Sequence, residues 1–172
     1  MKVILLLCIH SRQAVCSYVD APCIAPVLSA GPESNALQLE TAMLHFAKRN
    51  YHEAMVLYKK VLDECVHNSH DEVHAASFVV DPPGFSGRMI AANNYAICCV
   101  HNCCVEDGIK ALESLLQSDP MRFFRKELLF NLCTLYDLLL SKKDALMKKT
   151  ALKTVGEKYY LSHLQRKHYL LH

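Results

Sequence analysis

Apolar residues recur at helical spacing in three segments of the chain, residues 36–66, 89–120 and 126–152. Each segment is typical of two helices joined by a short break. Within each segment, a small residue is followed by another twelve positions later, in the pairs Ala42 and Ala54, Ala96 and Gly108, and Cys133 and Ala145. Antiparallel helices pack closely where small side chains meet. We therefore interpret these six residues as the packing points of three helical hairpins.

The hairpins resemble the tetratricopeptide repeat, a helix–turn–helix unit of about 34 residues. The resemblance rests on Tyr51 and Tyr58 on either side of Ala54, and on Asn131 shortly before Cys133. It implies an all-α fold in which tetratricopeptide-like helical hairpin repeats form a short α-solenoid. The three predicted repeats occupy residues 35–68, 89–122 and 126–159.

The segments between and around the repeats have other expected roles. Residues 1–34 are an N-terminal segment, either a helix or a flexible stretch, and its first 17 residues are typical of a signal peptide or of a truncated helix. Residues 69–88 are an inserted loop, because the run DPPGFSG ends any helix there. Residues 160–172 are expected to form a C-terminal helix or tail that caps the array.

The composition is that of an ordinary folded protein, with 52% apolar and 21% charged residues. No apolar run approaches the roughly 20 residues needed to span a membrane. A formal net charge of +2 does not favour nucleic-acid binding. From Lys142 onward, however, the chain carries eight basic and two acidic residues. We interpret this basic end as a solvated helix face, with contact to anionic lipid or to an acidic partner as the alternatives.

Nine cysteines and ten histidines raise the question of metal or thiol chemistry. The densest group is the run CCVHNCC, in which Cys98, Cys99, Cys103 and Cys104 surround His101. Structural zinc sites draw cysteine pairs from separate loops, whereas a single helix points such thiols in different directions. Core packing is the preferred interpretation, with no metal, cofactor or catalytic residue expected. A zinc- or thiol-dependent enzyme is the alternative, although no phosphate-loop, nucleophile-elbow or metalloprotease motif occurs.

The second and third segments also resemble a narrower family, subunit 12 of the trafficking protein particle (TRAPP) complex. The resemblance is carried by the run AANNYAICCVHNCCVEDGIKALESLLQSDP, and after it by Leu129, Phe130, Asn131, Leu132, Tyr136 and Asp137. The run LHFAKRNYHEA in the first segment is similar to the preceding unit of that family. The resemblance covers roughly residues 37–152 and matches the C-terminal end of much longer proteins. The insertion and both ends of this chain depart from the family pattern.

This resemblance implies a non-catalytic protein–protein interaction scaffold in a vesicle-tethering complex that acts between the endoplasmic reticulum and the Golgi. The implied partners are other TRAPP subunits. Nucleic acid is not expected, and membrane contact is expected only indirectly or through the basic C-terminal segment. The implied location is the cytoplasm, in association with the early secretory pathway and the Golgi. A generic tetratricopeptide adaptor with a different partner remains the alternative.

The working surface of such an array is its concave face, which the first helix of each repeat lines. In repeat register, that face should carry Leu39, Met43, Phe46, Asn93, Ile97, Val100, Phe130, Thr134 and Asp137. A mainly apolar groove fits a helix of a partner, whereas the alternative is that these residues are core shared between repeats. Of the positions that clamp an acidic C-terminus in chaperone-binding repeats, only Asn94 matches, so we do not expect a carboxylate clamp.

Overall fold

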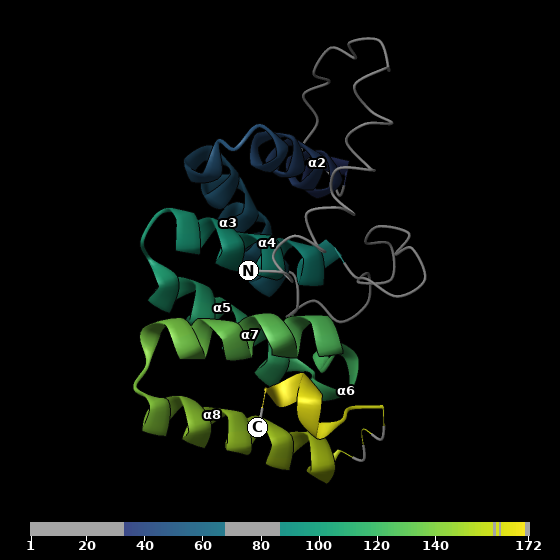
Figure 1. Cartoon of the computed structure of the whole chain (residues 1–172). Coiled ribbons are helices and arrows are strands. Elements are labelled where there is room, and N and C mark those ends of the chain that lie inside the picture. The colour runs from purple at the N-terminus through teal and green to yellow at the C-terminus, as the bar shows by residue number, and fades with distance from the viewer. Residues whose placement is uncertain (1–32, 68–86, 160, 162, 171–172) are drawn as a thin grey trace.

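The computed structural model describes residues 33–67, 87–159, 161 and 163–170 of the chain. Every regular element among these residues is helical, which confirms the predicted all-α class. Six longer helices form three pairs, a one-turn helix joins the second pair to the third, and a 3₁₀ helix follows the third pair (Figure 1). In chain order the elements are α2 (Glu33–Ala47), α3 (Tyr51–His67), α4 (Gly87–His101), α5 (Val105–Ser118), α6 (Pro120–Phe123), α7 (Lys126–Leu139), α8 (Lys142–Lys158) and η3 (Arg166–Tyr169).

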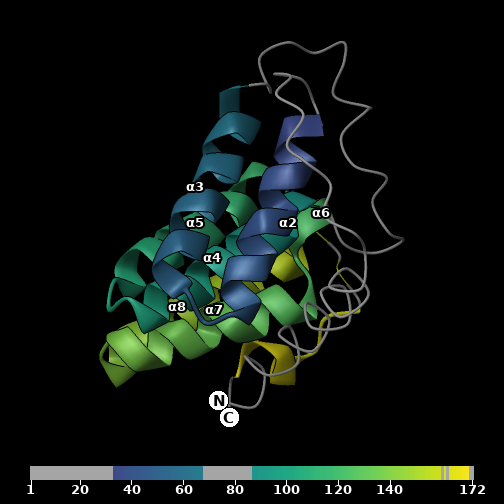
Figure 2. The ribbon, with the colours of Figure 1, turned by 90° about the horizontal axis from the view of Figure 1, so that it is seen from above.

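The helix pairs are stacked on one another in the order of the sequence (Figure 1). α3 packs against α4, α4 against α5, and α5 against α7, so each pair contacts the next. Seen from above, α2 and α3 cross α7 and α8 at a wide angle, which shows that the pairs rotate along the stack (Figure 2). Hairpins that contact mainly their neighbours and rotate steadily are the features of a solenoid.

The turns of the first two hairpins close in the same way. Arg49 and Cys103 both adopt a left-handed conformation, with φ of 64° and 59°. The residue after each, Asn50 or Cys104, donates its backbone N–H to a carbonyl five residues earlier, at 2.9 Å in both cases. This is the Schellman arrangement that ends many helices. The two turns lie 54 positions apart, as Ala42 and Ala96 do, so the hairpins repeat in backbone geometry as well as in packing residues.

The second helix of the third hairpin, α8, and the linker helix α6 begin with side-chain caps. The Ser141 hydroxyl accepts a hydrogen bond from the Asp144 backbone N–H at 3.2 Å, which starts α8. The Asp119 carboxylate does the same for the backbone N–H of Arg122 at 3.1 Å, and Pro120 occupies the first helical position of α6. Serine, aspartate and an early proline are the residues that satisfy or avoid the free N–H groups of a helix start.

Two apolar clusters form the core, and α4 contributes to both. One cluster joins the first and second hairpins, and the other joins the second hairpin to the third and to η3. The six small residues at the twelve-residue spacing are all buried: Ala42, Ala54, Ala96, Gly108, Cys133 and Ala145. At one of these crossings the helices nearly touch, because a Cβ atom added to Gly108 would lie 3.0 Å from Ala96 Cα.

The C-terminal end of the stack is covered by η3 rather than by a long helix. Tyr169 of η3 is buried, and η3 contacts both α7 and α8. A Cβ atom at Gly156 of α8 would overlap the Tyr169 hydroxyl, so a glycine there lets η3 lie directly on α8. The N-terminal segment 1–32 and most of the inserted loop predicted at 69–88 lie outside the described residues.

We expect Gly108→Ala to lower the free energy of unfolding by about 1–3 kcal/mol, the usual loss on overpacking. The new methyl group would meet the Ala96 backbone and Cys99 Cβ at 3.0–3.2 Å, and neither can move without shifting a helix. Alanine otherwise stabilises a helix interior relative to glycine by up to about 1 kcal/mol. Urea denaturation followed by circular dichroism measures the change.

Gly156→Ala is the matched comparison, and we expect a smaller loss from it. There the obstacle is the far end of the Tyr169 side chain, which can rotate away. If Gly108→Ala were neutral, or less costly than Gly156→Ala, the close approach of α4 and α5 would be refuted.

Candidate functional site

The nine residues predicted to line a concave groove divide into two groups. Four of them are buried, namely Leu39, Phe46, Asn93 and Ile97. The others reach the surface, with Met43, Val100, Phe130 and Thr134 half-buried and Asp137 exposed. The structure therefore places almost half of the predicted groove in contact with neighbouring helices, and a partner can reach only the remaining five.

Asn93 belongs to a buried polar network that connects all three hairpins. Asn131 of α7 donates its amide N–H to Asn93 Oδ1 of α4 at 2.6 Å. Asn93 donates to Asn94 Oδ1 at 3.3 Å, and Asn94 donates to the hydroxyl of Tyr58 in α3 at 3.1 Å. All four residues are at most 7% exposed. Because a buried amide is costly without a partner, these asparagines serve the stack and are not available to a ligand.

Asp137 is likewise engaged within the chain. Its carboxylate accepts a hydrogen bond from Lys149 Nζ of α8 at 2.6 Å, and the Lys149 side chain is only 7% exposed. On the same helix, the Tyr136 hydroxyl donates to Glu113 Oε1 at 2.6 Å, and Lys148 Nζ approaches that oxygen at 2.9 Å. These polar contacts join α5, α7 and α8 to one another, and the Lys149 ammonium offsets the negative charge of Asp137.

The run CCVHNCC is distributed over several environments. Cys98 and Cys99 are buried in α4, whereas Cys104 is half-buried and Cys103 is exposed. The thiols of Cys99 and Cys104 both point to the sulfur of Met55 in α3, at 3.9 and 3.7 Å. Sulfur atoms packed in this way behave as polarizable apolar groups.

Thiol chemistry needs an ionised cysteine and a nearby base, and neither Cys99 nor His101 is arranged for these roles. Burial raises the pKa of the Cys99 thiol to about 12, so this group stays protonated at neutral pH. His101 does not join the cysteines but stacks on the Tyr51 ring, with centroids 3.8 Å apart. Within the described ranges, no group of three or more His, Cys, Asp or Glu side chains is placed to hold a metal ion.

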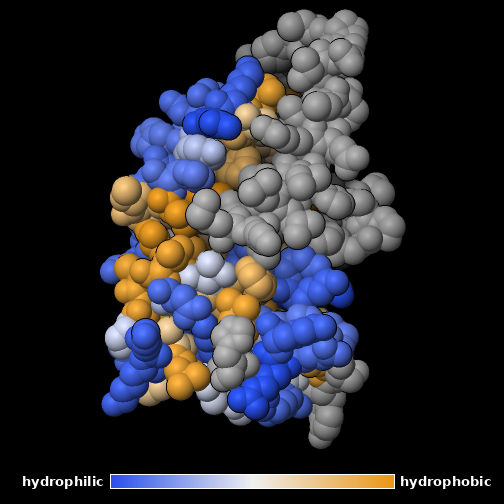
Figure 3. All heavy atoms as spheres, viewed as in Figure 1, coloured by the Kyte–Doolittle hydropathy of each residue, from blue (hydrophilic) through white to orange (hydrophobic). Residues whose placement is uncertain are grey.

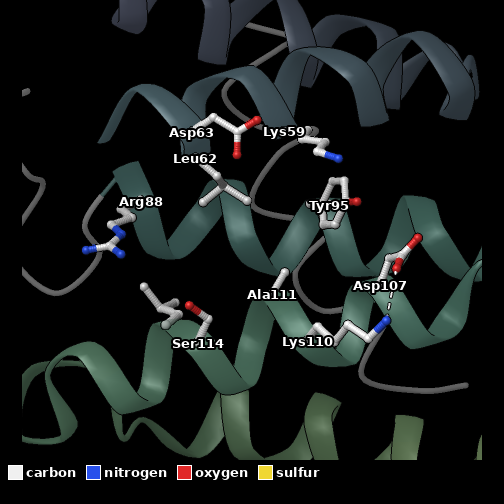
Figure 4. A pocket seen from close by; sticks show the side chains of 10 residues that line it. Lys59, Leu62, Asp63, Arg88, Tyr95, Asp107, Lys110, Ala111 and Ser114 are labelled. Carbon is white, nitrogen blue, oxygen red and sulfur yellow. Dashed lines mark ion pairs between the residues drawn. The ribbon is translucent and has the colours of Figure 1, made fainter. Parts of the chain in front are cut away.

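A pocket that the sequence did not predict lies between α3, α4 and α5 (Figure 4). Its volume is about 290 Å³. Its walls are α3 and α5, which contribute apolar side chains to the lining, and Tyr95 of α4 lies between the two walls (Figure 4). The apolar floor consists of Leu62, Ala111 and Leu115.

Charged side chains surround this floor. Lys59 and Lys110 come from opposite walls at the end where Tyr95 lies, and Arg88 lies toward the other end (Figure 4). Lys110 pairs with Asp107 at 3.7 Å, and the Arg88 guanidinium lies over the Phe123 ring at 5.9 Å. Lys59, in contrast, has no ion-pair partner in the part of the chain that the structure describes.

Tyr95 supplies a neutral hydrogen-bonding group at this end of the pocket. Desolvation by burial is the main cause that raises the pKa of its phenol, and the neighbouring Cys99 raises it further. The phenol is therefore protonated at any physiological pH.

The residues that line this pocket are visible in the sequence, but the sequence does not indicate that they lie next to one another. Lys59 and Asp63 on α3, and Asp107 and Lys110 on α5, are ordinary charged residues of amphipathic helices. Only the packing of both helices on α4 brings them together around Ala111. The signal that the sequence offered for this pocket was Ala111, a small side chain on the face of α5 where larger apolar side chains are usual.

Apolar side chains also reach the surface. Figure 3 shows apolar atoms along the left edge of the stack, next to polar surface. On the third hairpin, Leu138, Leu139, Leu146 and Met147 are between 41% and 61% exposed. Such side chains are typical of surfaces that contact other proteins only where they form one contiguous patch.

The stacked helical hairpins and their polar-rimmed pocket are features of an interaction module. The chain resembles TRAPP complex subunit 12: it is 27% identical over 117 residues to the Homo sapiens protein "Trafficking protein particle complex subunit 12". It is 26% identical over 119 residues to the Mus musculus protein of the same name. The matches cover 66% and 67% of this chain but only 13% and 12% of the relatives. No family model and no solved structure matches the chain.

None of the helices that the structure describes has both the length and the apolar character needed to cross a membrane.

We expect Asn131→Leu to lower the free energy of unfolding by about 1–3 kcal/mol, because it leaves Asn93 Oδ1 buried without its donor. Thr134→Val, one turn further along α7, is the control. The Thr134 hydroxyl bonds only to the Phe130 carbonyl of its own helix at 2.8 Å, so a change within about 0.5 kcal/mol is expected. Chemical denaturation measures both values.

Combining Asn131→Leu with Tyr58→Phe tests whether the network acts as a unit, since the two residues lie at its opposite ends. Coupled hydrogen bonds predict a combined loss smaller than the sum of the single losses. Strict additivity would show that the two ends are independent.

A zinc chelator is expected to leave the melting temperature unchanged, because the cysteines of CCVHNCC are separated among core, turn and surface. Cys99→Ser should destabilise the fold by about 1–3 kcal/mol through its buried hydroxyl, whereas Cys103→Ser at the exposed turn should change stability by less than about 0.5 kcal/mol. Stoichiometric zinc in the purified protein, lost together with the fold on chelation, would instead establish a structural metal site.

Proposed function

We propose that this chain is a non-catalytic scaffold that binds other subunits of a vesicle-tethering complex in transport from the endoplasmic reticulum to the Golgi. The observation that carries the proposal is the similarity to TRAPP complex subunit 12 across two thirds of the chain. Under this proposal the chain acts at the cytoplasmic side of early secretory membranes and is held there by its partners.

The geometry of the cysteines and histidines supports a role without catalysis. Burial raises the pKa of Cys133 to about 12, as it does for Cys99, so neither thiol is a ready nucleophile. Among the described residues, His101 stacks on the Tyr51 ring and forms no hydrogen bond with a thiol. A catalytic cysteine needs a nearby base and an accessible thiolate, and these three residues do not provide that combination.

The concave face remains a proposed contact surface, restricted to the predicted residues that reach the surface. Met43, Val100 and Phe130 are half-buried side chains from three successive hairpins. A partner helix that packs against them would cover apolar area without disturbing the buried asparagines. Ile97, at 4% exposed, supports this face from within and cannot test it, because a charge there would disrupt the core.

Affinity purification of the tagged chain, with mass spectrometry of the co-purified proteins, tests the proposal. We expect several TRAPP subunits, and we expect Phe130→Glu to reduce their recovery at least about tenfold, because the new charge would be desolvated at the interface. Thr150→Glu, on the exposed side of α8, is the control and should retain them.

Circular dichroism of each variant shows that the helices are intact. Recovery of an unrelated set of proteins would replace the tethering complex by another partner and would make the chain a different adaptor. Recovery of no partner would reject the scaffold proposal.

A further inference from the structure

We propose that the pocket between α3, α4 and α5 receives an acidic amphipathic helix of a partner protein, with a large apolar side chain on the floor and a carboxylate at Lys59. This proposal rests on the proposed scaffold function and names the chemistry of one partner. It concerns a different face from the predicted concave groove, because the walls of the pocket are the second helices of the first two hairpins.

The size of the pocket favours an anchoring side chain. Its volume of about 290 Å³ lies just below the range of roughly 300–1,000 Å³ that is usual for pockets that hold a whole small molecule. Protein interfaces commonly bury one or two large side chains in such a cavity, surrounded by polar contacts that exclude water. Ala111 lines the pocket with the larger Leu62 and Leu115, and its small side chain fills less of this space than a larger one would.

The charge of the pocket favours an acidic partner. Its lining carries three cations, Lys59, Arg88 and Lys110, against two carboxylates, Asp63 and Asp107. Of these groups, Lys110 pairs with Asp107 at 3.7 Å, whereas neither Lys59 nor Asp63, one helical turn further along α3, forms an ion pair within the described residues. The Lys59 ammonium, which forms no ion pair in the described ranges, lies at the same end as the Tyr95 phenol (Figure 4).

A helix brings the two required groups to the correct spacing. Side chains four positions apart on a helix lie about 5–6 Å from each other on one face, so an apolar residue and an aspartate or glutamate can reach the floor and the adjacent cationic end together. The walls of the pocket come from α3 and α5, and an amphipathic helix commonly binds along an apolar surface between two such elements.

Photo-crosslinking in the assembled complex locates the occupant. Ser114 is exposed and lines the pocket, so Ser114→benzoylphenylalanine should crosslink to a partner segment that has a large apolar residue within four positions of Asp or Glu. The same photoreactive residue at Thr150 of α8 is the control and should not label that segment. Crosslinks from Ser114 to a neutral or basic segment, or to residues 68–86 of the same chain, would overturn the proposal.

Charge reversal tests the electrostatic contact. Lys59→Glu should weaken capture of the crosslinked partner at least about tenfold, and changing the identified acidic residue of the partner to lysine should restore it. Lys60→Glu is the matched control, because Lys60 is the next residue of α3, lies outside the pocket and pairs with Glu64 at 3.9 Å. Equal effects of Lys59→Glu and Lys60→Glu would show that only the overall charge matters and would refute the proposed contact.

The outcomes separate the two proposals. If TRAPP subunits are captured but Ser114 crosslinks to no partner and Lys59→Glu has no effect, the pocket proposal fails and the scaffold proposal stands. If no partner is captured by the full chain, both fail together.

Discussion

The hydrogen bonds from Asn131 through Asn93 and Asn94 to Tyr58 determine how the three hairpins are aligned, because their donors and acceptors come from all of them. Apolar contacts are not directional, so leucine-rich helices could shift by a turn and still bury similar areas. Amides could not, since a shift would leave buried polar groups unpaired at about 1–3 kcal/mol each. Against a total stability of about 5–15 kcal/mol for a typical domain, this penalty selects one alignment.

The same constraint explains the unusual composition of α4. Every residue of this helix from Ala91 to Cys99 is buried, because α3 and α5 cover it and its asparagines reach α7. A helix enclosed on all sides needs small side chains where its neighbours approach, which alanine and cysteine provide. The cluster of thiols thus follows from the central position of α4. The helices pack very closely where Gly108 of α5 meets Ala96 of α4, since an added Cβ atom at Gly108 would lie 3.0 Å from Ala96 Cα.

The sequence predicted the all-α class and the three hairpins because helical periodicity and the spacing of small residues are local signals. It did not predict which side of α4 would face a neighbour. Repeat register places Asn93 and Ile97 on the first-helix face, but it does not reveal that the hairpins rotate enough to bury them. The pocket was missed for a related reason, since Lys59 and Lys110 are far apart in sequence and meet only through the packing of α3 and α5 on α4. At the C-terminal end, Gly156 offered a local signal, but its meaning depends on the position of Tyr169.

Some charged side chains stabilise the stack, whereas others are left for a binding partner. At the contact of α7 with α8, Lys149 is nearly buried, so its ammonium needs the Asp137 carboxylate to offset the loss of hydration. Lys59 is exposed and hydrated in the isolated chain, so it needs no internal partner. Any protein that covers the pocket removes that hydration. If its surface were only apolar, the cost of desolvating Lys59 would cancel part of the binding free energy gained by burying apolar area. A carboxylate from the partner compensates for the loss most strongly, because it supplies both a hydrogen-bond acceptor and the opposite charge, whereas a basic or wholly apolar surface supplies neither. The charge left unpaired at Lys59 thereby discriminates between partners that would fill the apolar floor equally well.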